Sequence, residues 1–146
     1  MTVIDRSALV AFPDQVMFDL VNDIEAYPEF LPECKGAEIL EKNERQVTAR
    51  LDLAKGGVGY SFTTCNTFES PASMTMDLVD GPFQSLRGVW TFKRLDAGAC
   101  KISLHLEFEV KGKLLGKALG TLFNQVANNM VDAFSKRAEY LSRSKE

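Results

Sequence analysis

The stretch CKISLHLEFEV, from Cys100 to Val110, alternates strictly between apolar and polar side chains, and a different pattern replaces it after Gly112. The alternation predicts a strand with one buried and one exposed face, and it puts His105, the only histidine, on the exposed face. After Gly112 apolar residues recur every three or four positions without a proline. This spacing predicts one helix of about 28 residues and roughly 40 Å. The fold therefore depends on how a sheet covers a single long helix.

The segment from 35 to 110 also has period-two patterning, and five short turns divide it into six expected strands. The turns lie at 42–44, 55–57, 70–71, 80–82 and 96–98. Connections this short join antiparallel neighbours, because parallel strands need crossovers of a dozen or more residues. A further strand at 2–10 and two short helices precede them. We therefore predict an α+β helix-grip fold in the order β-α-α-β6-α, with about seven antiparallel strands curved around the C-terminal helix.

Composition indicates an ordinary globular chain. Its 146 residues are 45% hydrophobic and 25% charged, which fits one domain, 1–146, with 143–146 frayed. Cys34, Cys65 and Cys100 are odd in number and widely spaced, so we expect reduced thiols and no metal site. Asp5 and Arg6 interrupt the N-terminal segment, and no apolar run could span a bilayer. The prediction is a cytoplasmic protein with at most transient, peripheral contact with the inner membrane face.

Positive charge gathers towards the C-terminus although the net charge is −3. Residues 111–146 contain seven basic and three acidic side chains. Such residues usually form a solvated face, but they could also contact phosphate groups. The candidates for phosphate contacts are Lys111, Lys113, Lys117, Lys136 and Arg137.

The segment DIEAYPEFLPEC, 23–34, keeps much apolar surface in a turn-like sequence with two prolines. It could plug the end of the core, or it could form a lid over a cavity; the acids Glu25, Glu29 and Glu33, expected to keep one side of the segment in water, favour the lid. Strand and helix spacing also directs large apolar side chains inward, either as packed core or as the lining of a cavity for an apolar ligand. These inward candidates are Phe62, Met76, Trp90, Phe108, Phe123 and Met130.

Catalytic groups do not converge in this sequence. The single histidine faces outward, and the acids lie mostly in turns or on polar faces. Phosphate-binding, nucleophile-elbow and zinc-protease motifs are absent. We predict no enzyme activity, no catalytic residue and no required cofactor. A cyclase or dehydratase is the weaker alternative, since it rests on fold analogy alone.

Three segments carry a family resemblance: YPEFLPEC (27–34), VDGPF (79–83) with Trp90 following, and NNMVDAF (128–134). They resemble the START-like family of coenzyme Q binding proteins, related in fold to Bet v 1, and within it a bacterial branch of ribosome association toxins. The resemblance covers essentially the whole chain. It implies a helix-grip fold with a hydrophobic cavity that binds ubiquinone or another isoprenoid lipid in support of respiration. The alternative that it implies is binding to the large ribosomal subunit, which blocks subunit joining, with a small antitoxin protein as partner.

Carried onto this chain, the resemblance assigns further residues to the cavity mouth. The lid motif falls on Tyr27, Phe30, Leu31 and Pro32, and the turn motif ends at Phe83. Of the two functions, apolar ligand binding is our first expectation from the sequence and ribosome binding is the second.

Overall fold

The computed structural model describes residues 2–69, 72–112 and 114–144. It contains both the long strand and the long helix that the sequence predicts. Three predicted features fall wholly or partly outside the described part: the turn at 70–71, the candidate phosphate contact Lys113, and the last two residues of the segment expected to fray. The elements, in chain order, are β1 (Thr2–Val10), α1 (Asp14–Asn22), the 3-10 helix η1 (Ile24–Glu29), β2 (Cys34–Lys42), β3 (Gln46–Lys55), β4 (Val58–Glu69), β5 (Ser73–Asp80), β6 (Phe83–Asp96), β7 (Ala99–Val110) and α2 (Leu114–Ser144). The predicted element order is confirmed, and helix α2 continues through 143 and 144.

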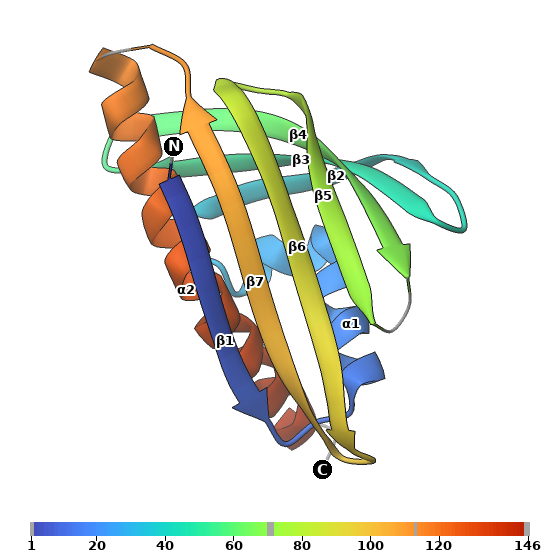
Figure 1. Cartoon of the computed structure of the whole chain (residues 1–146). Helices are drawn as coiled ribbons and strands as arrows, with labels where there is room; N and C mark the ends of the chain where they lie inside the picture. The colour runs from blue at the N-terminus through green and yellow to red at the C-terminus, as the bar shows by residue number, and fades with distance from the viewer. Residues whose placement is uncertain (1, 70–71, 113, 145–146) are drawn as a thin grey trace.

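All strands belong to one antiparallel sheet with the order β1-β7-β6-β5-β4-β3-β2. Consecutive strands from β2 to β7 are neighbours, as the short turns predict, and β1 pairs with β7 from Thr2 opposite Phe108 to Val10 opposite Cys100. Register shifts interrupt the pairing in β2, β4 and β6. Bulges of this kind bend strands and increase twist, so the sheet can curve. Figure 1 shows the sheet wrapped around α2, which confirms the helix-grip prediction.

The core lies between the concave face of the sheet and α2. Trp90 of β6 and Phe134 of α2 are both fully buried, and their rings meet edge to face at 5.4 Å. Helix α1 closes the neighbouring part of the sheet by burying Phe18 against Phe92, with ring centroids 5.6 Å apart. Inward residues of β7 are buried and His105 is exposed, as the alternation predicts. Within the described residues, no helix combines the length and hydropathy needed to cross a membrane.

Candidate functional site

The segment between α1 and β2 is an ordered 3-10 turn that covers one end of the core. Tyr27 is the anchor of η1, because its side chain is buried and its hydroxyl donates a hydrogen bond to the carbonyl oxygen of Val21. Burial raises the pKa of the Tyr27 phenol above its ordinary value, and the nearby Cys34 and Asp23 add to the shift. Tyr27 also packs edge-on against Phe134 at 5.3 Å. The end of η1 is therefore attached both to α1 and to α2.

Phe30 follows η1 and is held from two sides. Its ring packs edge-on against Phe134 at 5.2 Å and against Tyr27 at 6.1 Å. The guanidinium of Arg137 lies 5.1 Å from the centre of the same ring, and Arg137 Nη2 is 3.1 Å from Glu29 Oε1. The second ring beside this guanidinium is Tyr140, at 5.2 Å. Arg137 therefore joins η1 to the last turns of α2.

An apolar cavity of about 50 Å³ lies under η1, between the sheet and α2. Six of the predicted residues line it: Tyr27, Leu31, Phe62, Met76, Phe123 and Met130. The strands and helices add a further set, which comprises Ile24, Cys34, Ala49, Leu51, Leu53, Thr64, Asn66, Leu86, Leu104, Leu106, Val126 and Ala127. Ligand pockets for drug-sized molecules have volumes of roughly 300–1,000 Å³. In this conformation the core is therefore nearly solid.

Two polar side chains interrupt the apolar lining. Thr64 and Asn66 of β4 are both buried, and the Thr64 hydroxyl donates to Asn66 Oδ1 at 2.8 Å. The sequence analysis missed them, although a signal was present: both share the strand parity of Phe62, which was predicted to face inward. A buried pair of this kind can form a hydrogen bond with one polar group on an otherwise apolar molecule.

The other predicted cavity residues lie outside the lining. Phe83, Trp90 and Phe108 are buried in solid core, where Phe83 packs against the rings of Phe62, Phe108 and Phe123. Phe30 packs above the cavity, and Pro32 is exposed and borders a surface cleft instead. Strand parity identifies which face a residue occupies, but the curvature of the sheet decides how near it lies to the cavity.

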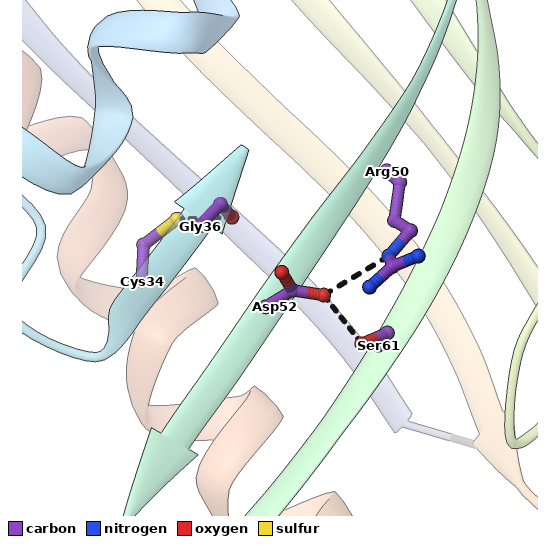
Figure 2. Close-up of polar contacts among 5 residues, drawn as sticks. All are labelled: Cys34, Gly36, Arg50, Asp52 and Ser61. Atoms are coloured by element: carbon purple, nitrogen blue, oxygen red, sulfur yellow. Dashed lines mark hydrogen bonds and ion pairs between the residues drawn. The ribbon is translucent and has the colours of Figure 1, made fainter. Parts of the chain in front are cut away.

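The rim of the sheet beside the cavity carries a polar cluster on its outer surface (Figure 2). Ser61 donates a hydrogen bond to Asp52, and Arg50 Nε donates to the same carboxylate at 3.1 Å. Both hydrogen bonds hold the pKa of Asp52 below its ordinary value, and the bond from Ser61 has the larger effect. A side chain at Gly36 would come within 2.6 Å of Asp52, so glycine lets this carboxylate lie across β2. On the cavity side of β2, the Cys34 thiol donates to the Gly36 carbonyl at 3.3 Å.

The predicted phosphate-contacting residues fall into two groups. Lys136 pairs with Asp132 at 3.0 Å, and Arg137 pairs with Glu29, with only 14% of the Arg137 side chain exposed. Arg137 is thus committed to the contact with η1, which sequence could not reveal because Glu29 is 108 residues away. Lys111 and Lys117, near the start of α2, are exposed. Lys113 lies outside the described residues.

The described residues contain no cluster of side chains that could hold a metal ion. His105 is 3.6 Å from Glu107 and 3.9 Å from Asp5, but all three side chains are on the outer face of the sheet, about half exposed or more. Across residues 2–69, 72–112 and 114–144, histidine, cysteine and acidic side chains form no group that could hold a metal ion.

Comparison with known families and relatives gives consistent matches. The family model described as polyketide cyclase/dehydrase and lipid transport matches residues 10–135. A Pseudomonas aeruginosa protein named ribosome association toxin RatA is 50% identical over 140 residues, which cover 96% of this chain and 97% of that protein. The mitochondrial coenzyme Q-binding protein of Schizosaccharomyces pombe is 24% identical, with 91% of this chain and 84% of that protein covered.

Solved structures support the same fold. A Mycobacterium smegmatis START superfamily protein aligns with a TM-score of 0.79 and 24% identity over 95% of this chain and 98% of the other. A Streptomyces aromatase/cyclase aligns with a TM-score of 0.82 and 18% identity over 94% and 93% of the two chains. At these identities the structural likeness establishes the fold alone.

Proposed function

Because this chain belongs to the polyketide cyclase/dehydrase and lipid transport family, and within its START-like members to the RatA branch, we propose that it binds the large ribosomal subunit and blocks subunit joining. One observation carries the proposal: half of the residues are identical to a protein named ribosome association toxin RatA across nearly the full length of both chains. On this proposal the protein works in the cytoplasm, by binding and without a catalytic step.

The geometry of the core supports a function at the surface. A cavity of about 50 Å³ is several times smaller than the pockets that hold small-molecule ligands. Binding to another macromolecule requires no internal space. It requires an exposed surface of matching shape and charge, and exposed lysines near the start of α2 offer such a surface.

Sedimentation through a density gradient tests the proposal. Purified tagged protein is mixed with separated large and small subunits at low salt, and each fraction is probed for the tag. We expect the protein in the large-subunit fraction and not in the small-subunit fraction. A protein that stays at the top of the gradient with both subunits would rule the proposal out.

Apolar ligand binding is the second candidate, and the lined cavity under η1 favours it. Its lining contains Met76 and Met130, whose flexible side chains can repack around a guest. The likeness to a coenzyme Q-binding protein and the family description add support. Binding an isoprenoid quinone would require the cavity to enlarge well beyond its volume of about 50 Å³. Organic extraction of the purified protein followed by mass spectrometry tests this, since a carrier should retain a lipid and a surface-acting protein should not.

A further inference from the structure

Two open surface clefts meet at the turn between β3 and β4. Figure 1 shows this end of the sheet beside the first half of α2. Lys55 and Val58 border both clefts. The first cleft runs from these residues towards Lys35, and the second runs along α2 past Lys117 to Gln125. We call this continuous surface the hairpin–helix groove.

The groove is positively charged although the whole chain is negative. Its lining contains three lysines, Lys35, Lys55 and Lys117, and a single acid, Glu33. None of the ion pairs formed among the described residues involves any of these lysines. By contrast, the arginines at 50, 87 and 137 and Lys136 each pair with an acid of this chain. The groove therefore carries positive charge that is not neutralised within the described structure.

The β3–β4 hairpin contacts α2 through the side chain of Lys55. Lys55 Nζ lies 3.5 Å from Gln125 Oε1, a neutral group that holds the amine without cancelling its charge. Lys117 and Gln125 are eight residues apart on α2, which is about 12 Å along the helix axis. The Lys55 amine thus lies beside α2 about 12 Å along the helix axis from the level of Lys117, a separation that one extended strand can contact.

The turn at the edge of the groove presents backbone instead of side chains. Gly56 and Gly57 have φ angles of +59° and +81°, in the left-handed region that glycine tolerates best. Nothing lies within 4 Å of the position that a side chain would occupy at either residue. A partner can therefore approach this backbone closely, and backbone N–H groups are among the donors that contact phosphate oxygens.

We propose that the hairpin–helix groove is the surface that docks on ribosomal RNA, through phosphate contacts of Lys55 and Lys117, with Lys35 extending the contact. The proposal rests on the proposed ribosome binding and specifies where and how it occurs. Phosphates are the chemistry that matches amines whose charge no acid of the described structure neutralises, along an open groove. The sequence analysis predicted Lys117 but missed Lys35 and Lys55, which lie on other elements.

The test compares two double variants with the same change of net charge. Lys55→Gln with Lys117→Gln removes two groove amines. The control, Lys93→Gln with Lys101→Gln, removes two exposed amines that face each other across β6 and β7 near the turn at the opposite end. Affinity for purified large subunits is measured by sedimentation at several salt concentrations. Thermal melting establishes that all proteins fold, since substitutions at exposed positions usually change stability little.

Each lysine–phosphate contact contributes about 0.9 to the slope of log affinity against log salt. If the ionic contribution vanishes near 1 M salt, two contacts are equivalent to roughly 60-fold in affinity at 0.1 M. We therefore expect the groove variant to bind about 60-fold more weakly than the wild type, with a slope shallower by about two. The control should differ from the wild type by less than threefold, with the same slope as the wild type.

Other outcomes overturn distinct statements. If the wild type binds and both variants lose affinity equally, or neither loses any, the groove is not the docking surface. The proposed binding to the large subunit would still stand. A groove-specific loss without a change in slope means that the groove contacts a ribosomal protein and not RNA. Failure of the wild type to bind contradicts the proposed function itself.

Discussion

Phe30→Ala tests whether the segment around η1 is a packed part of the core or a loosely held cover. Phe30 is partly buried and packs edge-on against Tyr27 and Phe134, with the Arg137 guanidinium over its ring. Truncating a fully buried phenylalanine costs about 3–5 kcal/mol. Because Phe30 keeps part of its surface in water, we expect a loss of about 2–3 kcal/mol in the free energy of unfolding. In a domain of this size that corresponds to a melting temperature lower by about 5–10 °C.

Tyr140→Ala is the matched control. Tyr140 lies beside the same guanidinium, at 5.2 Å, but its side chain is 58% exposed. Its removal costs one exposed cation–π contact, about 0.5–1 kcal/mol. Urea unfolding of the wild type and both variants measures the difference. Equal losses in the two variants, or a loss below about 1 kcal/mol for Phe30→Ala, would refute the packed arrangement and favour a mobile lid.

Three further predictions follow from the cavity and from the titrating groups. Ala49→Val adds volume where Ala49 borders the cavity, so it should leave ribosome binding unchanged in sedimentation assays and lower any retention of quinone; in melting assays the overpacking should cost at most about 1–3 kcal/mol. Tyr27→Phe should cost about 1 kcal/mol at neutral pH by removing the hydrogen bond to Val21. Since burial raises the Tyr27 pKa, the wild type should lose stability as pH rises above the ordinary value of 10, and the variant should lose less in urea titrations at high pH. The pKa of Asp52 is lowered, chiefly by the hydrogen bond from Ser61. The ionised Asp52 should therefore stabilise the folded state above the ordinary pKa of 3.8, and this stabilisation should vanish as pH falls below that value. Ser61→Ala should make acid unfolding depend less on pH in that range.

Sequence patterns were sufficient for the fold because each one constrains local geometry. The alternation in β7 determines which side chains point inward, and short turns leave only antiparallel neighbours, so the order from β2 to β7 follows. The helical spacing after Gly112 predicts α2 for the same reason. The pairing of β1 with β7 joins distant segments, and the turns do not predict it. The volume of the cavity could not be predicted from the sequence. It is the small difference between the space inside a curved sheet and the summed volumes of many side chains.

Contacts between distant segments were also missed. Arg137 reads as a free cation on a helix, yet in the structure it binds Glu29 and covers Phe30. Lys55 reads as a turn residue, yet the fold places it beside Gln125 of α2. The first pairing depends on where η1 lies relative to α2, and the second on where the turn between β3 and β4 lies relative to α2. Local periodicity carries no information about that distance, so the candidate site could be predicted only in part.

Subunit joining is the measurement closest to the central claim. Purified large and small subunits are mixed in magnesium-containing buffer with increasing amounts of the protein, and light scattering follows the formation of joined ribosomes. We expect the protein, incubated first with large subunits, to lower the amplitude of joining in proportion to its occupancy, and the Lys55→Gln, Lys117→Gln variant to require a correspondingly higher concentration. Full joining at protein concentrations that saturate the large subunit would contradict the account.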